Sequence, residues 1–479
     1  MSRLKQLSRD SLIYGFGEIL AKGTGFLLLP IYTRIFSPAD YGAIEMLTVL
    51  SSFLTAFLVM GMDSAQSFFF FKEKKMGKIA QRQLVSAILQ WRLIWGTGIV
   101  TLATICSPLL NYWLFDSMLS WQYFAAAFAA ALFSTVMSQS IEIFRLLYRP
   151  WAYVLVAMFG SIFTAAIILT LVMSFRQGIW GYFSGATIGS AVTAIFGWFL
   201  IRDYIEFSRL HTQWWPRLLR FGLPLLPAGL GFYVMSTTDR WFIQHHFGAD
   251  ELGLYAVGAK FALLLTVVIE AFRKAWWPIA MDAMHSEDGP ETYRMIARLY
   301  VGIGVIGVVI LGFISPWLVK WVVGPQFYSS WPIIGVLAWQ SLFYGVFLVV
   351  SAGIWKTEKT YLNMYLMIMA GVVNVILNAF LVPKYGGMGA AIATALTFFI
   401  WIVVSAIVSE RLWQVRFPFT IMAIQIGIGV LTVFWLTTQH EDINILIQLS
   451  VITAVIILLL FSSFDEITRK TIHTKVISK

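Results

Sequence analysis

Two oppositely charged side chains, Glu18 and Lys22, stand four residues apart within an apolar stretch near the start of the chain. Four residues make about one helical turn, so this acid and this base share a helix face and can form an ion pair. Ionisable side chains inside apolar helices are costly and usually face the protein interior or water. Two interpretations follow: a structural ion pair that locks two helices, or a cavity wall on which Lys22 meets an anion while Glu18 sets the charge of the lysine or binds a coupling cation.

Three more basic residues interrupt apolar stretches, namely Arg92, Arg240 and Lys260. Such cations either bind an anionic group inside the membrane or extend to the lipid headgroups when they lie near a helix end. Arg240 follows Asp239 and shares a helix face with Tyr233, whose ring could stack on a sugar. We therefore predict that these residues line a substrate cavity.

Acids and amides supply a second set of candidates. Asp239, Glu45 and Glu270 are predicted to lie at membrane depth, where each could bind a coupling proton or sodium ion. Asn374 and Asn378 lie along one side of an apolar segment. Asparagines in such helices either form hydrogen bonds between helices or bind sugar hydroxyls, and the spacing leaves both interpretations open.

The motifs of enzymes and metal centres are missing from the sequence. It contains no HExxH, no GxxxxGK[ST] and no GxSxG segment. The single cysteine, Cys106, excludes an intrachain disulfide and a multi-cysteine metal site. We predict no enzymatic activity, no metal site and no cofactor, so energy would come from a Na+ or H+ gradient, the membrane potential or the substrate's own gradient.

The composition requires these residues to be placed in a membrane. Of the 479 residues, 59% are hydrophobic and only 12% are charged, whereas globular proteins contain about 25% charged residues. An apolar helix needs about 20 residues to cross the hydrocarbon core. We predict an all-α polytopic membrane protein whose fourteen spans are 11–33, 43–62, 84–107, 121–144, 151–173, 178–200, 221–243, 252–272, 296–319, 331–354, 361–382, 386–409, 418–438 and 443–464.

The positions of the basic residues predict the orientation. Of the 34 Lys and Arg residues, 26 lie at the two termini and in every second loop, and such residues accumulate on the cytoplasmic side. Both termini are therefore predicted to be cytoplasmic. The first stretch should remain as a span, because no small-residue cleavage site follows it. The net charge of +10 is dispersed over these loops, where it meets anionic lipids, so nucleic acid is excluded as a partner.

An internal repeat predicts the architecture. Leu20, Gly23, Gly25, Phe26 and Arg34 superpose on Leu226, Gly229, Gly231, Phe232 and Arg240, and Phe36, Asp40 and Gly42 then match Phe247, Glu251 and Gly253. The shift carries spans one to six onto spans seven to twelve in the same orientation. We predict two parallel six-helix lobes around a central cavity, at residues 1–210 and 211–410, followed by two additional spans and a cytoplasmic tail at 411–479.

Several short motifs resemble those of a known family. They comprise Tyr14-Gly15, the runs Gly23–Phe26 and Pro30–Arg34, the segment SPADYG at 37–42, Asp239-Arg240, GLYAVGAK at 253–260 and YGGMGAAI at 385–392. Together with the two lobes, they are similar to the polysaccharide transporter branch of the multidrug/oligosaccharidyl-lipid/polysaccharide exporter superfamily. The two extra C-terminal helices resemble the fourteen-helix arrangement of lipid II flippases.

This resemblance implies a flippase in the bacterial inner membrane. Its substrate would be an undecaprenyl-diphosphate-linked oligosaccharide, moved to the outer leaflet by alternating access, and its partners would be membrane lipids and glycan-assembly proteins. Lys22, Arg92, Arg240 and Lys260 would then bind the diphosphate. Two alternatives stay open: a cation-coupled multidrug exporter of the same superfamily, and an integral-membrane oligosaccharide polymerase or ligase.

Overall fold

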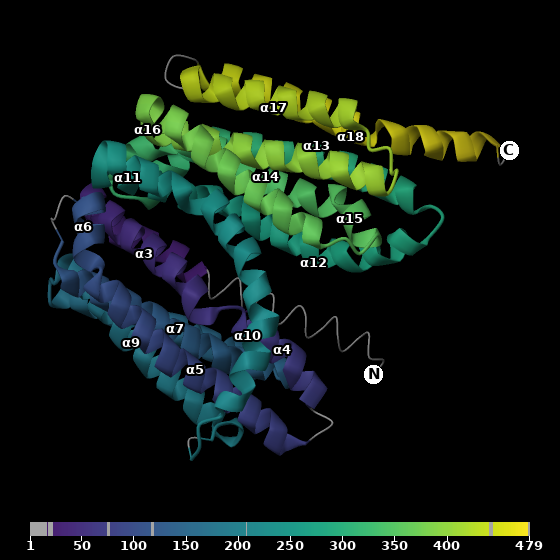
Figure 1. The fold of residues 1–479 in the computed structure, drawn as a ribbon. Coiled ribbons are helices and arrows are strands. Elements are labelled where there is room, and N and C mark those ends of the chain that lie inside the picture. The colour runs from purple at the N-terminus through teal and green to yellow at the C-terminus, as the bar shows by residue number, and fades with distance from the viewer. Residues whose placement is uncertain are drawn as a thin grey trace. The chain divides into compact units, whose positions relative to one another are not determined.

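The computed structural model describes residues 17, 23–73, 77–115, 119–206, 208–439 and 444–477, and these ranges contain helices and no strand (Figure 1). The side chains of residues 228, 439 and 465–477 are not described. The all-α prediction is confirmed for the described residues. The α-helices are α2 (Leu29–Ile35), α3 (Pro38–Val59), α4 (Met62–Lys72), α5 (Lys78–Ile105), α6 (Ser107–Phe115), α7 (Trp121–Leu146), α8 (Pro150–Leu169), α9 (Gly178–Leu200), α10 (Trp215–Gly222), α11 (Leu226–Ala262), α12 (Leu264–His285), α13 (Gly289–Val322), α14 (Trp331–Val350), α15 (Ala352–Lys356), α16 (Tyr361–Leu412), α17 (Phe419–Gln439) and α18 (Ile445–Ile477).

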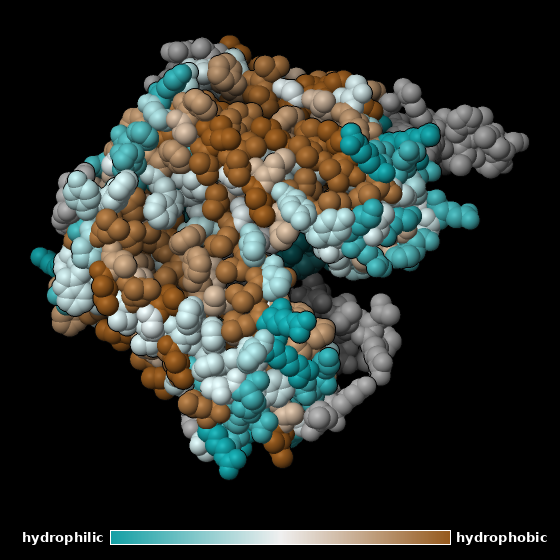
Figure 2. All heavy atoms as spheres, in the orientation of Figure 1, coloured by the Kyte–Doolittle hydropathy of each residue, from teal (hydrophilic) through white to brown (hydrophobic). Residues whose placement is uncertain are grey.

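The helices are apolar enough to cross a membrane, and many of their apolar side chains lie on the protein surface. Within the described residues, 11 continuous helical stretches have the length and composition of membrane spans. Large apolar side chains are widely exposed, among them Leu27 at 74% and Trp321 at 88%, and Figure 2 shows broad hydrophobic areas on the face in view. Soluble proteins rarely expose apolar surface on this scale. The chain is therefore an integral membrane protein.

Two of the 11 stretches are too long for a single span. Helix α16 has 52 residues, and a helix of that length measures about 78 Å against about 30 Å of hydrocarbon. Its non-helical residue, Gly386, coincides with the predicted start of a span, and Gly248 breaks α11 in the same manner. Both glycines have positive φ angles, of 55° and 78°. The break at Gly386 divides α16 into two membrane-length parts, whereas the part of the stretch Gly229–His285 that follows Gly248 is still longer than one span. The count of fourteen spans stays a prediction.

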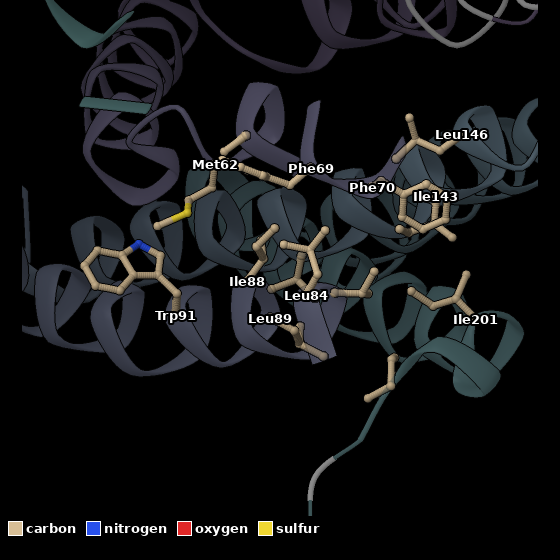
Figure 3. Packing of buried hydrophobic residues seen from close by; sticks show 14 of the residues in the cluster. Met62, Phe69, Phe70, Leu84, Ile88, Leu89, Trp91, Ile143, Leu146 and Ile201 are labelled. Atoms are coloured by element: carbon tan, nitrogen blue, oxygen red, sulfur yellow. The ribbon is translucent and has the colours of Figure 1, made fainter. Parts of the chain in front are cut away.

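The chain forms two compact units, which we describe separately. Unit 1 comprises Met1–Tyr233 and Phe247–Gly253. Within it α9 packs against α7 and α8, and α7 also contacts α3 and α5. Figure 3 shows the apolar core where α4, α5 and α7 meet, with Phe69, Leu84 and Ile143 buried among the labelled side chains. This core fixes the position of the polar side chains on the same helices.

Unit 2 comprises Val234–His246 and Leu254–Lys479. Here α14 packs against α13 and α16, and the last two helices, α17 and α18, both contact α13. Gln425 of α17 donates hydrogen bonds to Ser462 and Ser463 of α18, at 3.0 and 3.1 Å. Arg298 of α13 donates to the Ser462 carbonyl at 2.5 Å. Polar contacts thus attach α18 to unit 2, whereas the predicted lobe limits at 210 and 410 stay a prediction.

Helices extend into segments that the sequence marks as polar. Residues 273–295 form one of the longest polar stretches, yet α12 continues to His285 and α13 begins at Gly289. Helix α3 likewise begins earlier than predicted, at Pro38, because Ser37 and Asp40 form a reciprocal capping box. Capping satisfies backbone groups that the helix itself leaves unpaired. The observed helices therefore project beyond their apolar parts.

The two repeat segments around Gly42 and Gly253 pack directly against each other within unit 1. A Cβ atom at Gly42 would lie 1.8 Å from the Ala249 carbonyl oxygen. A Cβ atom at Gly253 would lie 2.0 Å from the Pro38 carbonyl oxygen. Since the predicted repeat aligns 38 with 249 and 42 with 253, the contact is reciprocal, as a two-fold axis between equivalent segments would make it. Only glycine allows this approach at either position.

Candidate functional site

Among the described acids of unit 2, Asp239 is the most strongly buried, with the residue 1% exposed. The first half of α11 carries it, and the second half carries Tyr255, whose hydroxyl donates a hydrogen bond to Asp239. The Thr394 hydroxyl of α16 lies 3.4 Å from the same carboxylate oxygen. Arg240 pairs with the other oxygen at 2.8 Å and places its guanidinium 5.5 Å from the Tyr255 ring. The carboxylate thus has one charged partner and two hydroxyl partners in a buried setting.

The predicted asparagines lie together on the first half of α16. The Asn378 amide donates to the backbone and side-chain oxygens of Asn374, both at 2.9 Å. Asn374 in turn donates to the Thr397 hydroxyl at 3.2 Å. Both asparagines are fully buried, and Asn378 Oδ1 has no hydrogen-bond partner among the described residues. Because Thr394 and Thr397 stand on adjacent turns, the asparagine pair and Asp239 contact the same part of α16.

A buried cation occupies unit 1. Arg92 of α5 is 0% exposed, and its guanidinium donates to the Thr135 carbonyl and to the Asp63 carboxylate. Its partner Asp63 stands in the first turn of α4, with 45% of the side chain exposed. Arg92 therefore links α4, α5 and α7. These contacts give Arg92 a structural role in holding the three helices together. Its role in substrate binding stays a prediction.

Replacing Arg92 should destabilise unit 1. Arg92→Met keeps most of the side-chain volume but removes the hydrogen bonds to the half-exposed Asp63 and to the buried Thr135 carbonyl, a loss of about 1–3 kcal/mol. We expect a lower thermal unfolding midpoint for the purified protein. The Asp63→Asn/Arg92→Met variant removes both charges and should recover part of the loss. An unchanged midpoint for Arg92→Met would contradict the structural role.

The remaining predicted residues occupy separate positions. Tyr233 donates its hydroxyl to the Val49 carbonyl, and its ring lies 5.6 Å from the ring of Phe53. Glu270 pairs with Arg273 one turn away at 2.6 Å. Lys260 and Glu45 are half-buried. Glu18 and Lys22, by contrast, lie outside the described residues. The structure forms two pairs from the predicted residues: Asp239 contacts Arg240, and Asn374 contacts Asn378.

Sequence reasoning missed Asp63, Tyr255, Thr394 and Thr397. Asp63 lies just beyond the predicted second span, so it counted as a loop residue. The two threonines and Tyr255 are common in apolar helices, where hydroxyls usually bond to their own backbone. The Thr394 hydroxyl instead faces Asp239. Only the motif GLYAVGAK, which contains Tyr255, gave a sequence signal for any of them.

Comparisons with known proteins agree with this architecture. A lipid II flippase, MurJ, in an inward closed conformation superposes with a TM-score of 0.70 and 14% identity, over 96% of this chain and 99% of that one. An inward-facing multidrug resistance MATE transporter of the MOP superfamily gives a TM-score of 0.62 and 16% identity, over 82% and 95% of the two chains. The chain therefore shares the fold of these proteins.

Sequence relatives come from bacteria and archaea. Protein 1 of the Lsg locus of Haemophilus influenzae is 25% identical over 333 residues, covering 67% of this chain and 78% of that protein. An uncharacterized membrane protein of Methanocaldococcus jannaschii is 21% identical over 422 residues, covering 82% and 95%. The model of the polysaccharide biosynthesis protein family matches residues 7–284. This match spans more than half of the sequence, and the chain accordingly belongs to the polysaccharide biosynthesis protein family.

Proposed function

We propose that this protein is a flippase for a polyprenyl-diphosphate-linked oligosaccharide. It would move the substrate from the cytoplasmic to the outer leaflet of a bacterial inner membrane by alternating access, with both chain termini in the cytoplasm. The observation that carries the proposal is the family match over residues 7–284. The shared fold with a lipid II flippase supports it. Membrane lipids and glycan-assembly proteins would be its partners.

The substrate determines what the protein must provide. A diphosphate carries negative charge that cannot cross about 30 Å of hydrocarbon unaided. Lys22, Arg240 and Lys260 are the cations that we propose for this group. Arg240 supports the proposal because it is held between the Asp239 carboxylate and the Ser236 carbonyl, at 2.8 and 3.1 Å. A change in the charge of Asp239 would therefore alter how strongly Arg240 attracts an anion.

Asp239 is our candidate for the coupling site. A proton or a sodium ion at its carboxylate would weaken the pair with Arg240, and so would link cation binding to anion binding. Hard cations prefer oxygen ligands, and the hydroxyl oxygens of Tyr255 and Thr394 contact the Asp239 carboxylate. Glu270 is less suited to this role, because Arg273 pairs with it one turn away.

Deleting the gene tests the proposal directly. We expect the deletion strain to accumulate a lipid-linked oligosaccharide on the cytoplasmic side and to lose surface glycan, with both effects reversed by the wild-type gene. Extracted lipids analysed by mass spectrometry would measure the first effect. Normal surface glycan in the deletion strain would contradict the proposal.

A cation-coupled multidrug exporter is the second candidate, and the shared fold with the MATE transporter favours it. A drug-efflux assay in a pump-deficient host separates the two functions. Drug resistance without any effect on glycan would favour the exporter.

The cation prediction concerns Lys22 and Lys260. We expect each alanine variant to reduce surface glycan in the deletion strain at least about tenfold, since an unpaired phosphate charge inside the membrane costs several kcal/mol. Lys260→Arg should retain activity, and Lys320→Ala provides a control at an exposed helix end. Immunoblots of membranes would verify insertion. Full glycan in both alanine variants would contradict a cationic clamp.

A further inference from the structure

Unit 1 contains a chamber that the proposed binding of the diphosphate does not use. Its volume is about 710 Å³, within the range of binding sites for small molecules. The walls come from α7, α8 and α9, from α2 and the segment that leads into it, and from Asp63 of α4. All of the lining residues belong to unit 1.

Hydroxyl groups and tyrosine rings form much of the lining. Ser134, Ser161 and Thr164 face it, and their hydroxyls make no hydrogen bond with another described residue. Other hydroxyls on these helices donate to the backbone of their own helix, as Thr193 of α9 does to the Gly189 carbonyl at 2.9 Å. Hydroxyls that are left without a partner in a cavity can bond to a polar ligand. Tyr182 adds an aromatic ring, 5.6 Å from that of Tyr32.

The charges of the described lining residues disfavour two classes of ligand. Its lining contains Asp63 and Glu142 and no Lys or Arg among the described residues. An anionic diphosphate would meet carboxylates without a lining cation. Both acids are already paired, Asp63 with Arg92 and Glu142 with Arg145 at 2.5 Å, so an organic cation would find little net negative charge. A neutral ligand with many hydroxyl groups fits best.

The carboxylates can still accept hydrogen bonds from such a ligand. Arg92 contacts Oδ1 of Asp63, and the side chain remains 45% exposed. Glu142 accepts from Ser67 at 2.7 Å through Oε1, the oxygen that Arg145 also contacts. One oxygen of each acid therefore has no partner in the described part of the chain. Charged acceptors form the stronger hydrogen bonds with hydroxyl donors.

We propose that this chamber binds uncharged sugar units of the lipid-linked headgroup, separately from the cations that meet the diphosphate. The inference rests on the proposed function for the identity of the substrate. It adds that unit 1 selects the glycan through Asp63, Glu142 and the hydroxyls of Ser134, Ser161 and Thr164. Sugar recognition and charge recognition are then carried by different residues.

Thiol labelling tests the chamber in the full-length protein. Ser138 lines the chamber and is exposed, whereas the native Cys106 is an exposed thiol outside the lining. In Ser138→Cys, oligosaccharides from partial acid hydrolysis of the host's surface polysaccharide should slow labelling at position 138 about tenfold. Labelling at Cys106 should be unchanged in the same molecules. Mass spectrometry of peptides would give both rates.

The competing ligands give decisive outcomes. Pyrophosphate and tetraphenylphosphonium should not protect position 138, and protection by either one without protection by the oligosaccharides would overturn the sugar assignment. In Ser161→Ala/Thr164→Val, which preserves side-chain size, we expect half-maximal protection to need about tenfold more oligosaccharide, since two hydrogen bonds are lost.

The two proposals fail differently. If deleting the gene stops surface glycan but no oligosaccharide protects position 138, the chamber assignment is wrong and the flippase remains. If surface glycan persists in the deletion strain while oligosaccharides still protect position 138, the flippase is wrong and the sugar site remains.

Discussion

Asp239→Asn should abolish glycan export while the protein still inserts into the membrane. The carboxylate of Asp239 accepts from Tyr255 and Thr394 and balances the charge of Arg240. An amide cannot release a proton, binds Na+ weakly and leaves the arginine charge unbalanced. We expect surface glycan in the deletion strain to fall at least about a hundredfold, equivalent to about 2.8 kcal/mol. Quantitative immunoblotting of the glycan measures the effect.

The same substitution also destabilises the site, so its controls must separate folding from coupling. Removing the carboxylate charge beside the Arg240 guanidinium, which is 14% exposed, costs about 1–3 kcal/mol. Asp239→Asn/Arg240→Gln removes both charges and should restore the thermal unfolding midpoint without restoring export. Asp239→Glu keeps the acid and should retain part of the activity. Wild-type export by the double variant would contradict a coupling role for Asp239.

Gly253→Val should disrupt the reciprocal contact between the two repeat segments. The added Cβ would lie 2.0 Å from the Pro38 carbonyl oxygen, a backbone atom that cannot rotate away. Either α3 or the segment around Gly253 must move, and forced overpacking of this kind costs about 1–3 kcal/mol, at times more. We expect a lower thermal unfolding midpoint and reduced export. Differential scanning fluorimetry of the purified protein measures the midpoint.

A glycine with open surroundings provides the matched control. A Cβ atom at Gly98 of α5 would meet nothing within 4 Å. Gly98→Ala should therefore be neutral or stabilise the helix by about 1 kcal/mol. Gly42→Ala, which would place its Cβ 1.8 Å from the Ala249 oxygen, should reproduce the loss seen at Gly253. Equal midpoints for all three variants would show that the close approach is unimportant.

Much of the fold could be predicted because a membrane imposes simple rules. Apolar length predicts a helix, since a backbone in hydrocarbon must satisfy its own hydrogen bonds. The break at Gly386 was predicted as a boundary between spans for the same reason. Helix ends were less predictable. Capping by Ser37 and Asp40, and continuation of α12 through its polar end, depend on local contacts that hydropathy does not contain.

Candidate site residues could be predicted where a charged side chain interrupts an apolar stretch. Asp239 and Arg240 are charged residues in an apolar stretch, and the structure pairs them. Arg92 was equally conspicuous, but its partner Asp63 was not, because 29 residues separate the two in the sequence. A salt bridge between two helices depends on which sides of the helices are in contact. A single sequence does not specify these contacts.

The sequence by itself determined that this is a helical membrane protein with a few ionisable residues in its spans, because the cost of burying polar groups in lipid acts on every residue separately. Tertiary structure alone decided the partners of those residues. It also placed the hydroxyls of Ser134, Ser161 and Thr164, which have no partner among the described residues, around one chamber. Such groups are inconspicuous in an apolar sequence, and they form a site only when packing leaves their hydroxyls facing the same space.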